Sequence, residues 1–180
     1  GGPVIERLAR EGDAGKIKFP VAKITDGRPD FSFSGLKTAV MRYLRENEIS
    51  PVGENETPGQ QIKDIAASFQ ATVIRSLLKP VEKLAAELHP KTLIVAGGVA
   101  CNGALRAAAE NLGAKFDLPV YFPSKHLSTD NAAMIAAAGT FHLQRGERSD
   151  LKMTADVTLR LQNYENEDAR LKNKKVRYRL

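Results

Sequence analysis

The sequence has little of what several protein classes depend on. It contains one cysteine, Cys101, which excludes an internal disulfide framework and fits a reducing compartment. The three histidines, His89, His126 and His142, follow no zinc-ligand spacing, so this chain alone is not expected to form a metal cage. No apolar run approaches the roughly 18 residues of a membrane-spanning helix, so no such helix is expected.

The first residues also lack the features of a targeting segment. The stretch from Gly1 to Glu6 has no initiator Met, no basic region and no apolar region, so a signal peptide is not expected. We interpret the chain as one that begins inside a longer sequence, through cleavage, through cloning or because an upstream half is disordered.

What the sequence does have is enough apolar material for a core and an excess of positive charge. Hydrophobic residues make up 42% and charged residues 27%, which excludes general disorder. The net charge is +6, and residues 170–180 contain six basic residues and no acid. Taking these six from the 27 basic residues leaves 21, equal to the 21 acids, so the body is formally neutral. The tail is expected either to contact phosphates or to be solvated and disordered.

Apolar periodicity predicts several helices. The helix over residues 62–88 is long, and Pro80 is expected to kink or split it, because proline removes a backbone donor and clashes with the preceding turn. Apolar residues at helical spacing favour helices over residues 3–11, 35–47, 62–88, 103–112 and 130–144.

Short strands are predicted between these helices. Polar and aromatic residues alternate over 30–34, as in a half-buried strand, and residues 16–24 suit an edge strand or an irregular extended segment. Apolar runs at 92–95 and 118–122 predict two buried strands, the first covered on both faces. The order strand, glycine turn, helix, strand predicts a right-handed βαβ unit, and with it an α/β fold with an open sheet.

Residues 95–102 combine paired glycines with the start of a helix. Gly97 and Gly98 let the backbone turn sharply and let a ligand approach without a Cβ in the way. The next helix offers free N–H groups and a positive dipole end, which suit a phosphate or ribose, and Asn102 is placed to bind a ligand hydroxyl. The alternative is structural: the glycines form a turn and Asn102 caps the helix. The spacing alone favours that alternative.

Asp130 stands at the start of the last predicted helix, after Ser128 and Thr129, which suit helix caps. A carboxylate in the first turn favours the helix dipole by roughly 0.3–1 kcal/mol, so Asp130 needs no function to be there. The functional alternative makes it a metal ligand at the carboxyl end of a sheet. Here too the pattern alone favours the structural interpretation.

Other polar residues carry no evident chemistry. No base partner accompanies Ser32 or Ser34 and no G-x-S-x-G motif surrounds them, so we expect Ser34 to cap the following helix, with Phe31 and Phe33 on one sheet face. Lys37 is expected to be a solvated helix residue. Cys101 is expected to pack beside the glycine turn, because no histidine is near it in sequence.

Five segments together resemble one known family: Gly1–Pro3, Asp30–Thr38, Asp64–Gln70, Ala96–Asn102 and Ser128–Ala136. In order they resemble the C-terminal part of the TsaD family, the tRNA threonylcarbamoyladenosine transferases, over residues 1–160. The resemblance implies an α/β lobe of the actin/Hsp70/sugar-kinase (ASKHA, RNase H-like) fold, with an open mixed sheet flanked by helices. Residues 161–180, the basic tail, lie beyond it.

The resemblance also implies an activity. Family members transfer the threonylcarbamoyl group of threonylcarbamoyl-AMP to the exocyclic amine of the adenine next to the anticodon, in tRNAs that read codons beginning with A. A cytoplasmic enzyme is therefore expected, with tRNA, threonylcarbamoyl-AMP and other proteins of the threonylcarbamoyladenosine pathway as partners, and no membrane. Two alternatives stay open: a non-catalytic paralogous scaffold of a tRNA-modification complex, and an O-carbamoyltransferase of the same fold.

By the same resemblance, four residues contact the adenylate and one holds a divalent metal. Gly2 and Asn102 match substrate contacts of the family, Gly97 and Gly98 line the same loop, and Asp130 matches an aspartate ligand of iron or zinc. The family's two histidine ligands and its phosphate-contacting segment belong to an N-terminal part that does not occur here. Activity of this chain by itself is therefore not expected, and no general base is identified.

Overall fold

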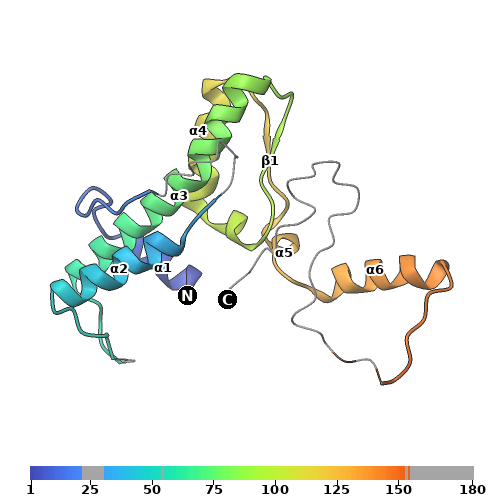
Figure 1. The fold of residues 1–180 in the computed structure, drawn as a ribbon, viewed down its shortest axis with the longest axis horizontal. Helices are drawn as coiled ribbons and strands as arrows, with labels where there is room; N and C mark the ends of the chain where they lie inside the picture. The colour runs from blue at the N-terminus through green and yellow to red at the C-terminus, as the bar shows by residue number, and fades with distance from the viewer. Residues whose placement is uncertain (22–30, 54, 153, 155–180) are drawn as a thin grey trace, which may run out of the picture. The chain divides into compact units, whose positions relative to one another are not determined.

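A computed structural model describes residues 1–21, 31–53, 55–152 and 154, most of which lie in helices (Figure 1). By its contacts the chain divides into two units, Gly1–Met134 and Ile135–Leu180. The predicted boundary between a lobe and a basic tail, near residue 160, lies outside the described residues. Within the described part of the chain, no helix has the length and apolar character needed to cross a membrane.

The predicted helices are all present, with ends that differ by a few residues. Pro3 lies in the first turn of α1, where its missing N–H costs nothing, and Pro80 lies inside α3 without splitting it. The helices are α1 (Gly2–Ala9), α2 (Ser34–Glu46), α3 (Gln60–Leu88), α4 (Gly103–Lys115), the short α5 (Lys125–Ser128) and α6 (Ala132–Gln144), with a 3₁₀ turn η1 (Gly98–Cys101) before α4.

Helix α3 is the centre of the first unit and packs against α1, α2 and α4. Small residues, Ala66 and Ala67, let α1 approach closely through Ala9. Larger side chains of α3, among them Ile65 directly before Ala66, build a second cluster with α2. Its buried members are Phe19, Leu36 and Ile65.

Hydrogen bonds from α3 hold the loop that follows α1. The Ser68 hydroxyl donates to the Asp13 carbonyl at 3.2 Å and accepts from the Ile17 N–H at 3.1 Å. The Asp64 carboxylate accepts from the Asp13 N–H at 2.9 Å and from the Gln60 amide at 2.8 Å. These two donors, the backbone N–H first, lower the pKa of Asp64 below its usual value. The matched segment 64–70 therefore has a clear structural use.

The sheet contains two parallel strands in the described residues, β1 (Leu93–Ile94) and β2 (Val120–Tyr121). Leu93 pairs with Val120 and Ile94 with Tyr121, which confirms the parallel strand–helix–strand order. The prediction of two buried strands, the first covered on both faces, is wrong, because Ile94 of β1 is 71% exposed and Tyr121 of β2 is 60% exposed. No described residue packs over these two side chains enough to bury them.

The predicted strand over 30–34 is also wrong where the structure describes it. Residues 31–33 are irregular. Ser34 does not cap α2 as predicted, because it is the first residue within the helix and its side chain makes no capping hydrogen bond. Phe33 packs into the second cluster with Leu36 and Val40, whose spacing is helical, so it belongs to the start of a helix, whereas Phe31 is 50% exposed. Asp30 lies outside the described residues. Residues 16–21 are irregular, and residues 22–24 of the predicted extended segment lie outside the described residues.

Candidate functional site

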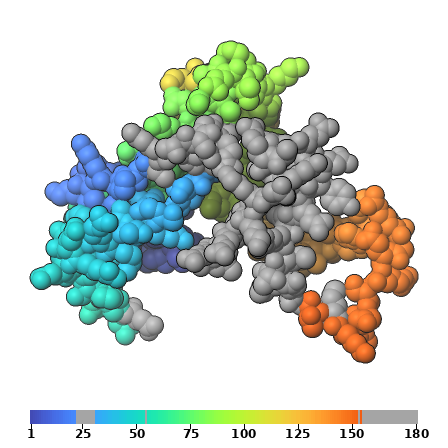
Figure 2. Space-filling view, in the orientation of Figure 1, coloured from blue at the N-terminus to red at the C-terminus, as the bar shows by residue number. Residues whose placement is uncertain are grey.

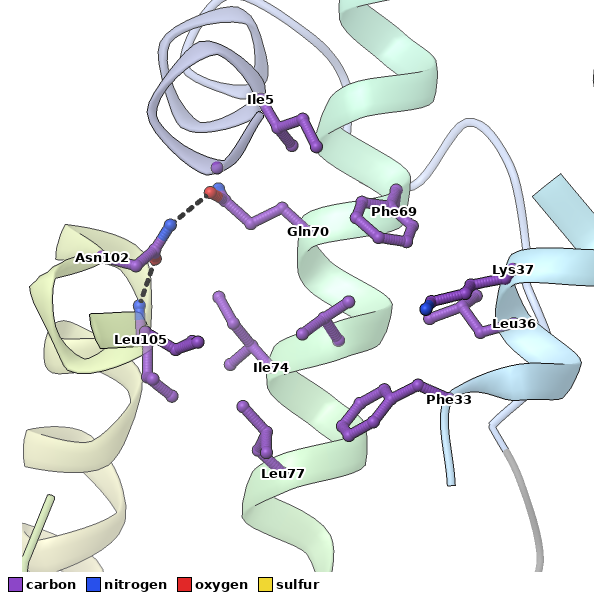
Figure 3. A pocket seen from close by; sticks show the side chains of 13 residues that line it. Ile5, Phe33, Leu36, Lys37, Phe69, Gln70, Ile74, Leu77, Asn102 and Leu105 are labelled. Carbon is purple, nitrogen blue, oxygen red and sulfur yellow. Dashed lines mark hydrogen bonds between the residues drawn. The ribbon is translucent and has the colours of Figure 1, made fainter. Parts of the chain in front are cut away.

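A pocket of about 470 Å³ lies between α1, α2, α3, η1 and the start of α4 (Figure 3). The volume falls within the roughly 300–1,000 Å³ of small-molecule sites. Most of its wall is apolar, and only three lining side chains are polar: Lys37, Gln70 and Asn102. The apolar wall includes Ile5, Phe33, Leu36, Phe69, Val73, Ile74, Leu77, Val99 and Leu105. Such a pocket suits a mostly apolar ligand that carries a few polar groups.

The structure brings two of the predicted substrate residues together. Gly2, at the start of α1, and Asn102, before α4, both line the pocket although 100 positions separate them. Gly97 and Gly98 do not line it, whereas their neighbour Val99 does. The predicted site is therefore only partly assembled around one cavity.

The two glycines before α4, Gly97 and Gly98, differ in what they do: Gly97 makes a backbone turn, and Gly98 leaves open space beside the backbone. Gly97 has a φ of 90°, in the region that favours glycine, so the prediction of a sharp turn is confirmed there. A Cβ placed on Gly98 would meet no atom within 4 Å. The space over Gly98 is therefore open to an approaching group.

Asn102 uses its side chain within the protein. Its Oδ1 accepts from the Leu105 N–H at 2.9 Å, which confirms the interpretation that it caps α4. Its Nδ2 donates to Gln70 Oε1 at 2.8 Å. One lone pair and one amide hydrogen remain for a ligand. Capping and ligand binding are thus compatible roles for this residue.

The start of α4 is not as free as the sequence suggests. Glu6 Oε1 accepts from the Gly103 N–H at 3.1 Å and also pairs with Arg10 at 2.9 Å. Burial raises the pKa of Glu6, but the hydrogen bonds from Arg10 and Gly103 outweigh it, and the pKa falls below its usual value. The prediction of a free N–H group for a phosphate is therefore wrong at Gly103, because a carboxylate of the chain already occupies that position.

Arg106 connects the glycine loop to the segment that leads to Asp130. Its Nε donates to the Ala100 carbonyl at 2.6 Å and its Nη2 to the Pro123 carbonyl at 2.9 Å. Its guanidinium lies 4.7 Å from the centre of the Phe122 ring. Helix α5, which follows Pro123, also contacts η1. The loop and the approach to Asp130 are thereby held together.

Asp130 lies in the turn between α5 and α6, outside the first helical turn, and its side chain is exposed. The predicted caps are wrong: Ser128 is the last residue of α5, and Asn131 Oδ1 accepts from the Met134 N–H at 3.0 Å instead. Among the described residues, no group of three or more His, Cys, Asp or Glu side chains could hold a metal. Asp130 thus offers a single ligand, and the residues present do not complete a metal site.

Three residues at or beside the site had no predicted role. Gln70 bonds to a partner 32 positions away and Glu6 to one 97 positions away, so no local spacing indicates them. The only feature of the sequence that pointed to Gln70 is its place in the segment 64–70, which resembles the family. Arg106 is four residues beyond Asn102 and carried no signal of its own. The packing role predicted for Cys101 agrees with its partial burial and its Sγ contact to the Lys125 carbonyl at 3.6 Å.

Comparisons with known proteins agree with one another. A family described as TsaD, tRNA N6-adenosine threonylcarbamoyltransferase, matches residues 1–137. Proteins named tRNA N6-adenosine threonylcarbamoyltransferase are 40% identical in Koribacter versatilis, 44% in Carboxydothermus hydrogenoformans and 42% in Clostridium perfringens. Each alignment covers 89% of this chain and 50%, 45% and 46% of the relatives, respectively. The chain therefore spans about half the length of these relatives.

Proposed function

The chain belongs to the TsaD family of tRNA N6-adenosine threonylcarbamoyltransferases, and on that premise we propose that it forms the C-terminal, adenylate-binding half of such an enzyme. Its β1–β2 pair is then part of the open mixed sheet of an ASKHA lobe. The complete enzyme acts in the cytoplasm on tRNA and threonylcarbamoyl-AMP, together with other proteins of the threonylcarbamoyladenosine pathway.

One observation carries this proposal: Gly2 and Asn102 line the same pocket. Gly2 has no side chain and a Cβ there would meet nothing within 4 Å, so a ligand can approach the backbone. Phe33 and Phe69 contribute aromatic rings to the wall, and rings of this kind stack favourably with a purine. An adenylate fits this combination of an apolar body and a polar edge.

In this role the chain's residues bind and orient the adenylate for transfer. Holding the two reactants in a fixed geometry lowers the entropic part of the barrier while the adenine amine of tRNA attacks the carbonyl and AMP leaves. No residue of this chain is assigned as the general base. Asp130 is proposed to hold iron or zinc together with ligands outside this chain, where such an ion would act as a Lewis acid. Because the described residues do not complete that site, no step is assigned to it.

The test is adenylate binding by the full-length protein, meaning an enzyme of the relatives' length that carries this sequence over the matched part. Asn102→Ala removes one hydrogen bond to a neutral group and is expected to weaken binding roughly 2- to 13-fold, measured by calorimetry with a non-hydrolysable adenylate analogue. Gly98→Val is expected to weaken it further, since its side chain would enter the open space over the loop.

A deletion of residues 163–180 is the control and should leave the affinity unchanged. Circular dichroism checks that each variant is folded. Equal affinity for the wild type, Asn102→Ala and Gly98→Val would contradict the proposed site. A wild-type protein that binds no adenylate would instead favour the non-catalytic scaffold.

A further inference from the structure

We propose that Gln70 is a positioning residue that fixes the amide of Asn102 at the edge of the pocket, an inference that rests on the adenylate site proposed above. Gln70 lies on α3 and Asn102 precedes α4, and both line the pocket (Figure 3). They are the two lining residues whose side chains are joined by a hydrogen bond, at 2.8 Å.

The backbone determines which way round the two amides face. The Leu105 N–H can only donate, so the atom of Asn102 that meets it must be the oxygen. The Nδ2 group of Asn102 is thereby turned to Gln70, which must present its own oxygen in return. The N-terminus of α4 thus fixes the orientation of the Asn102 amide, and Asn102 in turn fixes that of the Gln70 amide.

The surroundings strengthen this arrangement. Leu105 is buried and the Asn102–Gln70 hydrogen bond is itself partly buried, so water competes for it less than it would at an exposed site. Without Gln70, the cap to Leu105 would remain but Nδ2 would lose its partner. The amide would then be held by the cap alone, so the free hydrogen of Nδ2 would be aimed less firmly at a ligand acceptor, such as a ring nitrogen or a ribose oxygen.

Three variants of the full-length protein separate positioning from other roles. Gln70→Met keeps the length of the side chain and removes its acceptor. Gln70→Glu keeps an acceptor oxygen for Asn102, removes the amide hydrogens and adds a negative charge. Asn102→Asp keeps the acceptor that caps α4 and removes the donor to Gln70. Gln61→Met, at an exposed position of the same helix outside the pocket, is the matched control.

The probe is adenosine, because a neutral ligand avoids repulsion by the new carboxylate of Gln70→Glu. Calorimetry should show adenosine binding weakened roughly 2- to 13-fold by Gln70→Met, and unchanged within about twofold by Gln70→Glu and Gln61→Met. In the Asn102→Ala background, where no side chain can bond to Gln70, Gln70→Met should cause no further loss, because two residues that act through one bond are not additive.

A ligand-free readout accompanies the titration. The side-chain amide hydrogens of Asn102, followed by NMR, should exchange slowly with solvent in the wild type and in Gln70→Glu, and faster in Gln70→Met. This signal reports the hydrogen bond itself, and a dispersed spectrum shows in the same experiment that the variant is folded.

Other outcomes overturn the proposal in distinguishable ways. If Asn102→Asp weakens binding and Gln70→Met does not, the role of Gln70 is wrong while the adenylate site stands. If Gln70→Glu binds adenosine as weakly as Gln70→Met does, Gln70 contacts the ligand with its amide hydrogens and is not a positioning residue. If adenosine does not bind, or if Asn102→Asp has no effect on its binding, both the site and the role of Gln70 are wrong.

Discussion

Helices α3 and α6 are both predicted by the sequence, but only α3 is packed. Six residues of α3 are buried, whereas no residue of α6 is. The atoms of α6 are drawn in orange in Figure 2, and its side chains include Ile135, which is 75% exposed, and Phe141, which is 52% exposed. The 13 residues of α6 are close to the length at which an isolated helix is marginal in water. The comparison teaches that local propensity can form a helix, while burial requires a partner surface.

The same contrast separates the candidate site residues. Asn102 is held on both sides, by the Leu105 N–H and by Gln70. Asp130 is exposed and has no hydrogen-bond partner within the described ranges. The pocket is thus assembled by this chain itself, whereas Asp130 is a single ligand without the rest of its site.

The largest expected effect is on catalysis by the 180-residue chain. We predict that the chain transfers no threonylcarbamoyl group, because one aspartate cannot replace the three or more protein ligands of a typical catalytic metal site. The measurement is transfer to unmodified tRNA, with the full-length protein as control. Adenylate binding by the chain, measured in parallel, is expected to remain. Turnover comparable to that of the control would show that the site at Asp130 is complete within this chain, as the pocket at Asn102 is.

The second effect concerns the metal. In the full-length protein, Asp130→Asn is expected to reduce the bound iron or zinc sharply, because a neutral amide is a poorer ligand than a carboxylate. The thermal midpoint should change little, since the side chain is exposed and Asn131 caps α6 independently. Metal analysis of the purified variant decides the question. An unchanged metal content would leave Asp130 as an ordinary turn residue.

Two helical glycines test the packing contrast directly. A Cβ at Gly113 in α4 would collide with the Val120 side chain and the Leu118 carbonyl, so Gly113→Ala should lower the free energy of unfolding by about 1–3 kcal/mol. A Cβ at Gly139 in α6 would meet nothing within 4 Å, and Gly139→Ala should stabilise that helix by about 0.5–1 kcal/mol.

Urea unfolding measures the first variant, and helix content by circular dichroism follows the second. Destabilisation by Gly139→Ala would show that α6 is packed after all. A neutral Gly113→Ala would show that α4 and β2 are packed less closely than the structure indicates.

The smallest effect is expected in the pH dependence of stability. Because the folded protein lowers the pKa of Glu6, its carboxylate stabilises the fold fully above about pH 5, and this contribution is lost as the pH falls through the lowered pKa. The stability difference between the wild type and Glu6→Gln should therefore shrink as the pH falls from about 5 to about 3. Glu110→Gln, an exposed change on α4, is the control. A difference that does not vary with pH would contradict the role of the Glu6 charge.

How far the sequence predicts the site depends on how local each signal is. The cap at Asn102 and the turn at Gly97 were predictable, because each depends on neighbours within three or four positions. The carboxylate of Glu6 at the start of α4 was not, because its partner is 97 positions away. The strand predicted over 30–34 failed for a related reason. Phe33 packs with Leu36 at the start of a helix, while Phe31 is left half exposed, so the alternation did not mark a strand.

The sequence by itself determined the helices, the parallel strand order and the family, since periodicity and long matched segments are properties of the chain. Tertiary structure alone decided that Gly2, Gln70 and Asn102 meet around one pocket. It also decided that α3 is buried and α6 is exposed. The physical reason is that hydrogen bonds and apolar burial between distant segments depend on which surfaces face each other, and no local pattern of residues encodes that choice.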